Sequence, residues 1–195
     1  MTLLRRRRTA LTRNSGEREA QAARRLERIV RSGQAHTWDR QEVLGALVER
    51  HGRPRLDGAR LAAVGRLLSV IYWGELAAWK VSSELAETLE SPQARAAALA
   101  QSDDEARHFS SLHDYLGLVG WPATRLPRAT RRVLDAVLQA DSLAKKLVGM
   151  QLLVEPVALT FFQLLQDRQI EPVLSGLLAY VERDEARHIA LGINH

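Results

Sequence analysis

One pentapeptide rich in chemically active side chains occurs twice in the sequence. Asp-Glu-Ala-Arg-His stands at 104–108 and again at 184–188. The same offset relates Glu75 to Glu155, so each half carries a Glu and, at an equal distance further along, a Glu-x-x-His. A Glu and a His at positions i and i+3 lie on one face of a helix, about one turn apart, and both can point at a common site.

The equal intervals, from Glu75 to Glu105 and from Glu155 to Glu185, predict a helical hairpin in each half. At ~1.5 Å rise per residue, about 15 residues up and about 15 down return the chain to the same height. Turn signals at Ser91-Pro92 and Glu171-Pro172 lie near the middle of the two intervals. Two such hairpins packed face to face would bring four carboxylates and two imidazoles to one point: Glu75, Glu105, His108, Glu155, Glu185 and His188.

Four buried carboxylates repel one another and are costly to desolvate, and two cations would remove that cost. The sequence holds no Cys, so oxygen and imidazole must supply the ligands, a donor set that suits iron or manganese. The alternative is that the pentapeptide is an ordinary solvated helix segment that happens to recur. Two identical copies with two matched upstream glutamates favour a dinuclear metal site.

This pattern resembles the ferritin-like di-iron carboxylate superfamily, and within it the ribonucleotide reductase small subunit and the bacterial multicomponent monooxygenases. The resemblance covers roughly residues 60–195. It implies a cofactor of two iron ions, or of one manganese and one iron ion, with no flavin, nicotinamide or haem. It also implies the ligand roles: Glu75 and His108 on one metal, Glu155 and His188 on the other, and Glu105 and Glu185 bridging the two.

The Asp and Arg of the pentapeptide also need a reason to recur. The resemblance implies that Asp104 and Asp184 accept from the imidazole N–H of the opposite motif, with Arg107 and Arg187 beside them. Helix geometry agrees, because an Asp one position before the Glu is turned about 100° round the helix, toward a neighbouring helix. The alternative is that these residues form local pairs on the surface.

Several positions depart from the family pattern. Leu112 stands where the reductase carries its radical Tyr, so radical storage is disfavoured. Leu159 stands where the monooxygenases carry a Thr. Ferritins proper lack the second His, which disfavours simple iron storage. Pro156 directly follows Glu155 and predicts either a kink or a local helix bulge beside the metals. Side chains sharing the ligand faces are candidates for a substrate pocket, with core packing as the alternative: Tyr72, Trp79, Phe109, Leu112, Leu159 and Phe162.

The rest of the chain predicts an all-α fold, a ferritin-like four-helix bundle with additional N-terminal helices. No segment alternates apolar and polar residues with period two, and helix-forming residues dominate. The expected domains are a basic N-terminal arm with short helices over 1–57 and the bundle over 58–195. The last helix reaches the final residue in mid-pattern, which suggests a truncated C-terminus. Helices are expected near 17–30, 38–50, 58–89, 91–119, 127–166 with a break at 141–142, and 171–195.

The charge is divided unevenly along the chain. Residues 1–60 hold 15 basic and 7 acidic side chains, whereas residues 61–195 hold 13 and 16. The basic part, with Arg5–Arg8 at its start, has no aromatic residue before Trp38 on which bases could stack, so nucleic-acid binding is not expected. No stretch of about 20 consecutive apolar residues predicts a membrane span, no secretory signal is recognised, and a cytoplasmic location is expected.

Together these observations predict an O2-activating dinuclear oxidoreductase that hydroxylates, desaturates or otherwise oxidises a small-molecule substrate by two electrons. No flavin or nicotinamide fingerprint is present, so a separate reductase is expected to supply electrons, and a homodimer is possible. Two rivals stay open. One is an iron-handling or peroxide-scavenging protein without an organic substrate. The other is a metal-stabilised helical protein without catalysis.

Overall fold

The computed structural model describes the backbone of residues 2–194 and the side chains of residues 16–192. The side chains of Arg5–Arg8 therefore lie outside the described part. Every regular element within 2–194 is helical, which confirms the all-α expectation. The helices are α1 (Thr2–Ala35), α2 (Arg40–His51), α3 (Gly58–Thr88), α4 (Pro92–Leu118), α5 (Arg128–Leu138), α6 (Leu143–Gly149), the π-helix η1 (Met150–Val154), α7 (Glu155–Asp167) and α8 (Pro172–Asn194).

Local signals in the sequence account for several helix ends. The Asp39 carboxylate caps α2 by accepting from the backbone N–H groups of Gln41 and Glu42 at 2.8 and 2.9 Å. Ser91 caps α4, and Pro92 occupies its first turn, where a missing N–H costs nothing. Helix α1 differs from expectation, because it continues through Gly33 to Ala35. A single glycine costs a helix only about 1 kcal/mol, which packing can offset.

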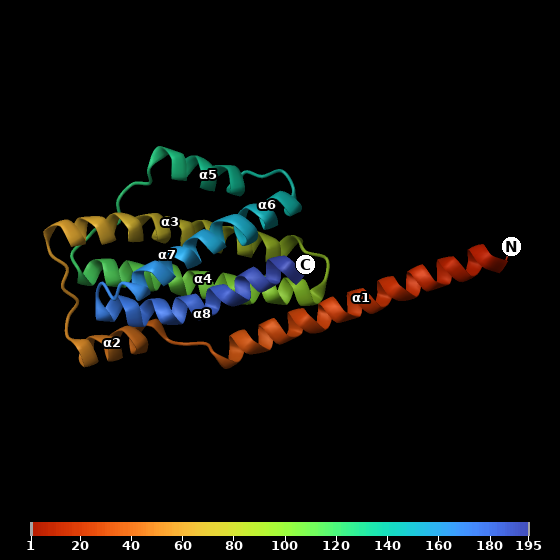
Figure 1. The fold of residues 1–195 in the computed structure, drawn as a ribbon, viewed down its shortest axis with the longest axis horizontal. Coiled ribbons are helices and arrows are strands. Elements are labelled where there is room, and N and C mark those ends of the chain that lie inside the picture. Colours follow the sequence, from red (N-terminus) through yellow and green to blue (C-terminus); the bar gives the residue numbers. More distant parts are fainter. Residues whose placement is uncertain (1, 195) are drawn as a thin grey trace.

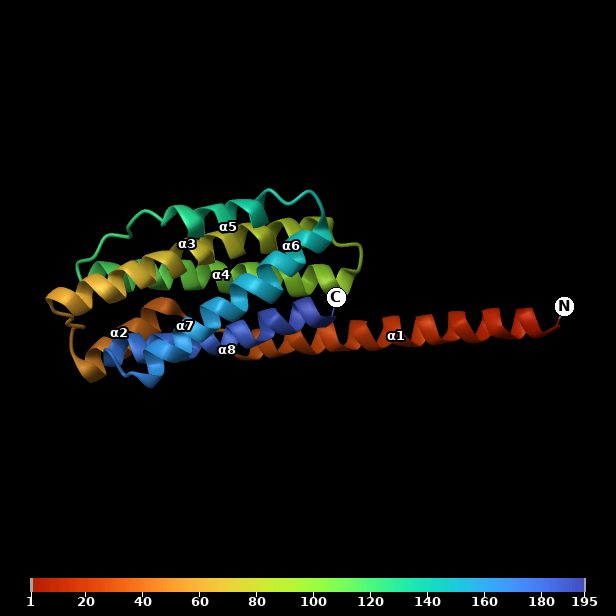
Figure 2. The ribbon, with the colours of Figure 1, turned by 45° about the horizontal axis from the view of Figure 1, so that its top comes forward.

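Helices α3 and α4 form one antiparallel hairpin, and the rod from α6 to α7 forms a second hairpin with α8 (Figure 1). The two hairpins lie side by side in both views, and α5 covers the outer side of α3 (Figure 2). The second half of α1 packs against α4 and α8, while its first half extends away from the other helices. This arrangement brings the two halves of the repeat into contact.

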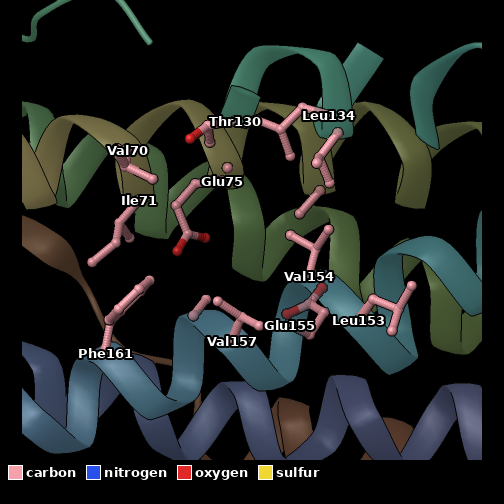
Figure 3. Close-up of a pocket in the computed structure, with 14 residues that line it drawn as sticks. Val70, Ile71, Glu75, Thr130, Leu134, Leu153, Val154, Glu155, Val157 and Phe161 are labelled. Atoms are coloured by element: carbon pink, nitrogen blue, oxygen red, sulfur yellow. The ribbon is translucent and has the colours of Figure 1, made fainter. Parts of the chain in front are cut away.

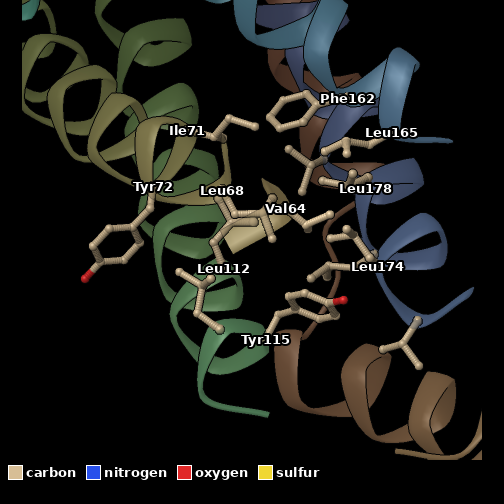
Figure 4. Packing of buried hydrophobic residues seen from close by; sticks show 14 of the residues in the cluster. Val64, Leu68, Ile71, Tyr72, Leu112, Tyr115, Phe162, Leu165, Leu174 and Leu178 are labelled. Atoms are coloured by element: carbon tan, nitrogen blue, oxygen red, sulfur yellow. The ribbon is translucent and has the colours of Figure 1, made fainter. Parts of the chain in front are cut away.

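Two apolar clusters lie at different heights along these helices. Figure 4 shows one of them, where Leu68, Leu112, Phe162 and Leu178 converge from four helices. The other holds Ala77, Leu85, Ala97, Met150 and Leu191. Along α3, α4, α7 and α8 the repeated Glu and His residues fall between the two clusters. Apolar packing above and below therefore excludes water from the level of these polar side chains.

The helix irregularity expected at Pro156 is a π-helix. Proline removes one backbone donor and its ring would clash with the carbonyl of Leu152 in a regular α-helix. The wider turn of η1 ends directly before Glu155, whose N–H donates to the carbonyl of Met150. The bulge interpretation is confirmed, and the segment before Glu155 is rotated relative to a regular helix.

The second half of α1 and helix α2 pack against the later helices. Leu26 of α1 and Leu44 of α2 are buried and belong to the two apolar clusters. The division into domains at residue 57 stays a prediction, but helices from both sides of that boundary share packing.

Two segments meet the length and composition test for a membrane-spanning helix, namely Gly58–Thr88 and Leu143–Asp167. The expectation concerned an uninterrupted apolar stretch, whereas these segments include polar residues. Half of the most apolar window is buried in the first segment and 28% in the second. Core helices of globular proteins pass the same test, and the absence of a membrane span stays a prediction.

Candidate metal centre

The six repeated Glu and His side chains meet at one place between α3, α4, α7 and α8. They form two overlapping groups whose ligand atoms lie within 4.8 Å of one another. One group holds Glu75 and His108, the other holds Glu155 and His188, and both share Glu105 and Glu185. All six side chains are buried. The spacing in the sequence gives these residues matching helix positions, and the fold brings them together.

The imidazole of His108 points its Nδ1 atom at three carboxylates. The distances are 3.4 Å to Glu75 Oε2, 3.2 Å to Glu185 Oε1 and 3.6 Å to Glu105 Oε2. Ligands about 2 Å from one ion at right angles lie about 3 Å apart, so these separations match the edges of a coordination shell.

The second imidazole repeats this arrangement. His188 Nδ1 lies 2.9 Å from Glu105 Oε1, 3.4 Å from Glu185 Oε2 and 3.8 Å from Glu155 Oε2. Glu105 and Glu185 thus turn one oxygen toward each imidazole. This is the geometry that a carboxylate bridging two ions requires.

Buried atoms without hydrogen-bond partners test whether metal ions fit. Nine buried side-chain atoms of the described residues lack a partner, and four of them are His108 Nδ1, His188 Nδ1, Glu105 Oε2 and Glu185 Oε2. Leaving such atoms unpaired costs about 1–3 kcal/mol each. All four belong to the two groups described above, so the residues present fit a pair of cations.

Behind each imidazole lies the Asp of the opposite motif. Asp184 Oδ2 is 3.2 Å from His108 Nε2, and Asp104 Oδ2 is 3.2 Å from His188 Nε2. These are the cross-motif contacts that the repeat predicts. A carboxylate behind a ligating imidazole fixes its tautomer and its ring orientation, so Nδ1 is left to face the site.

The two arginines close this arrangement into a ring of four charges. Arg187 donates to Asp104 at 2.9 Å and to Asp184 at 2.7 Å. Arg107 donates to Asp104 and, at 3.3 Å, to Asp184. Both the local pairs and the cross-motif pairs are therefore present, and each Asp is held by two arginines and one imidazole.

Charge in the cluster is balanced by mutual shifts of pKa. Burial would lower the pKa of His108 and His188, but hydrogen bonds and neighbouring carboxylates raise both well above the ordinary value. Burial would raise the pKa of Glu105 and Glu185, yet the imidazoles bring the pKa of Glu105 well below its usual range. A hydrogen bond with Glu155, together with the two imidazoles, brings the pKa of Glu185 to about 2.

The two outer carboxylates shift in the opposite direction. Burial and the charges of Glu185 and Glu105 raise the pKa of Glu75 and Glu155 well above the ordinary value. The imidazoles and the outer glutamates therefore hold protons more readily than the free side chains do, and the bridging carboxylates hold them less readily. Cations entering the site would displace these protons.

Trp38 was not recognised from the sequence as part of the site. It lies between α1 and α2, and its indole Nε1 donates to Asp184 Oδ2 at 2.7 Å. Its ring stacks on His108 with centroids 6.3 Å apart and lies under the guanidinium of Arg107. No repeat or spacing in the sequence marks it, because its partners lie far away along the chain, on α4 and α8.

Two buried glutamines were also missed. Gln101 Nε2 lies 3.0 Å from Glu105 Oε1 and 3.0 Å from Glu155 Oε1, and Gln151 donates to Gln101 Oε1 at 2.9 Å. Each glutamine stands at position i−4 from a repeated Glu, which places it one turn away on the same helix face. That spacing was the available signal.

An apolar cavity of about 220 Å³ reaches the site between α3, α5 and α7. Glu75 and Glu155 line its inner part, and Figure 3 shows their side chains together with Val157 and Phe161 of α7 and Thr130 and Leu134 of α5. The remaining lining residues are apolar: Val70, Ile71, Gly74, Ala78, Val133, Leu153, Val154 and Ala158.

None of the six pocket candidates from the sequence lines this cavity. Leu112 and Phe162 are fully buried in the core. Tyr72 and Trp79 lie on the side of α3 that faces α4, where the rings of Tyr72 and Phe109 stack with centroids 4.3 Å apart. Leu159 is partly buried outside the cavity.

The cavity lies beside Glu75 and Glu155, on the side of α3 that faces α5 and α7. Its α3 wall uses Ile71 and Ala78, which stand one turn before and one turn after Glu75. The π-helix turns Leu153 and Val154 into the cavity, and this phase shift cannot be read from regular helix periodicity.

Compared with models of protein families, with curated proteins and with solved structures, the chain shows no match.

Proposed function

We propose that this protein is a ferritin-like dinuclear metal oxidoreductase that activates O2 to oxidise a small apolar molecule. The observation that carries the proposal is the convergence of four Glu and two His at buried positions, with unpaired ligand atoms facing inward. This ligand set is the one described for di-iron and di-manganese carboxylate helix bundles.

The proposed ligand roles follow the distances. Glu75 and His108 hold one ion, Glu155 and His188 hold the other, and Glu105 and Glu185 offer one oxygen to each position. Two iron ions, or one manganese and one iron ion, would supply the redox chemistry when bound. Asp104 and Asp184 hold the imidazoles in the tautomer that leaves Nδ1 free to ligate.

The cavity beside Glu75 and Glu155 supports an organic substrate. Apart from these two carboxylates and Thr130, every side chain that lines it is apolar. Its volume of about 220 Å³ admits a small molecule only. A charged ligand would lose its hydration there without gaining polar partners, so the walls select a small, uncharged and mainly hydrocarbon substrate.

The reaction requires an external source of electrons. In a hydroxylation, one atom of O2 enters a C–H bond of the substrate and the other leaves as water, which consumes two electrons and two protons. We propose that a separate reductase supplies the electrons. The cavity distinguishes this proposal from iron handling or peroxide scavenging, neither of which needs an apolar chamber beside the ligands.

Anaerobic loading with ferrous ion followed by exposure to air tests the proposal. We expect two iron ions per chain, consumption of O2, and near-ultraviolet absorption as the iron becomes ferric. Filling the cavity with Ala78→Phe should leave iron content unchanged while it suppresses oxidation of an added small hydrocarbon. A protein that binds no metal would overturn the site. Rapid O2 or peroxide consumption that Ala78→Phe does not affect, with no organic product, would favour the iron-handling alternative.

A further inference from the structure

Two buried amides break the symmetry of the repeated site. Gln101 and Gln151 each stand at position i−4, Gln101 from Glu105 and Gln151 from Glu155. Both amides are buried, with 2% and 0% of their surface exposed. Each therefore stands one helical turn from a proposed ligand, on the face that points toward the site.

Neither amide has an amide as its equivalent in the opposite half of the repeat. The offset between the two copies of the pentapeptide relates Gln101 to Val181 and Gln151 to Ile71. Val181 and Ile71 are also buried, so each amide has a hydrocarbon side chain as its equivalent in the opposite half. This difference lies within one turn of the proposed ligands.

Both amides act on the same metal position. Gln101 Nε2 donates to Glu105 Oε1 and to Glu155 Oε1 at 3.0 Å each. Glu105 Oε1 is the oxygen that faces His188, and Glu155 Oε2, the partner of the bonded oxygen, also faces His188. The amide thus fixes which oxygen of Glu155 is presented. Among the described residues, no amide or hydroxyl side chain donates to Glu75.

The orientation of the amides has only one satisfactory solution. An ionised carboxylate only accepts, so the Gln101 amide must turn its nitrogen to the glutamates and its oxygen away. That oxygen accepts from Gln151 Nε2 at 2.9 Å. Gln151 reaches it from the π-helix and packs closely against α8 at Gly192, where a Cβ on the glycine would clash with the Gln151 side chain.

We propose that the Gln101–Gln151 pair makes the two metal positions inequivalent, so that the Glu155–His188 position binds the first ion and the Glu75–His108 position binds the second. This inference rests on the proposed function. A ligand already held in its binding orientation loses less conformational freedom when the ion arrives, and polar groups behind metal ligands typically alter affinity by about 10–100-fold. Gln101 is a positioning residue, because it acts through the carboxylates.

Stepwise binding of Mn(II) alone to the metal-free full-length protein, without O2, tests the inference. Calorimetry gives the two dissociation constants, and electron paramagnetic resonance separates single ions from coupled pairs. We expect two steps that differ by at least about 10-fold, with single ions dominating at the first equivalent. His188→Ala should remove the tight step, whereas His108→Ala should remove only the weak one.

Variants that replace each amide with an apolar side chain, as at its repeat equivalent, sharpen the test. Gln101→Leu should weaken the tight step by about 10–100-fold and leave the weak step unchanged. Gln151→Ile should act in the same direction but less strongly, because Gln101 remains. Gln163→Leu is the matched control, since this amide bonds Glu182 on the exposed side of α7 and α8. Circular dichroism of the metal-free variants checks that each one folds.

The outcomes distinguish failure of the proposed function from failure of the inequivalence of the two metal positions. If fewer than two ions bind to the unaltered protein, both the proposed function and this inference fail. If two ions bind with equal affinity, or if Gln101→Leu weakens both steps alike, the inference alone is overturned. The inference is also overturned if the tight step is lost in His108→Ala and kept in His188→Ala.

Discussion

Glu75 stands on an unbroken α-helix, whereas Glu155 follows directly on a π-helix and precedes a proline. The two hairpins otherwise carry the same ligands at the same intervals. Their turns differ as well. Ser91 caps α4 with its hydroxyl, while at the equivalent position the buried Glu171 caps α8 and also accepts from Tyr115 at 3.0 Å.

The two halves differ in the residues around the repeated Glu and His, whereas the Glu and His themselves are the same in both. His108 has an additional neighbour, Trp38 from between α1 and α2, through their shared partner Asp184. Glu155 has an amide partner, Gln101 of α4. A duplicated ligand set can therefore hold two ions in different surroundings, because residues one turn away from the ligands differ.

The largest expected effect comes from removing a ligand that both positions share. Glu105→Ala should abolish binding of both ions, because each position loses one carboxylate oxygen and the cluster loses a negative charge that would balance the cations. His188→Ala should remove one ion and leave the other. Metal analysis of the purified variants gives the measurement, with Glu182→Ala, on α8 but outside the site, as a control. Retention of two ions in Glu105→Ala would contradict the bridging geometry.

A smaller effect is expected from the aspartates behind the imidazoles. Asp104→Asn should weaken binding at the His188 position and Asp184→Asn at the His108 position, each by about 10–100-fold, with the fold retained. Titration with Mn(II) would resolve which step changes in each variant. Equal weakening of both steps in both variants would show that the four-charge ring acts as one unit.

The same aspartates give the metal-free protein a dependence on acid. Burial would raise the pKa of Asp184, but His108, Trp38 and Arg187 hold it well below its ordinary value of 3.8. The ionised form therefore stabilises the fold above about pH 4, and this contribution is lost as the pH falls further toward the lowered pKa. The pKa of Asp104 is also lowered. Urea unfolding between pH 2 and 5 should show a shallower pH dependence in Asp184→Asn than in the unaltered protein.

The smallest effect is expected at Trp38. Trp38→Phe keeps the ring but removes the N–H that Asp184 accepts, while His108 and Arg107 still contact that carboxylate. We expect a loss of about 1 kcal/mol in the free energy of unfolding and a few-fold weaker binding at the His108 position alone. Trp73→Phe, which removes a similar bond to the carbonyl of Thr124, is the control. Weaker binding at the His188 position alone would contradict the assignment of Trp38 to the surroundings of His108.

Much of the ligand set followed from the sequence. The repeated pentapeptide and the matched glutamates indicated which six residues should meet, because helix rise and the i, i+3 spacing are local geometry. The caps at Asp39 and Ser91 and the irregularity before Pro156 were also local signals. These features depend only on residues near one another in the chain.

What the sequence could not decide depends on how helices meet. Tyr72, Trp79 and Phe109 were expected in the substrate pocket, but the rotation of α3 turns them toward α4 and leaves Ile71 and Ala78 at the cavity. Such rotations are set by packing between helices, which no single helix specifies. Trp38 reaches Asp184, far away along the chain, for the same reason. The sequence by itself indicated the six Glu and His residues and their helical spacing, whereas only the tertiary structure decided which side chains stand behind them and which side of the cluster is open.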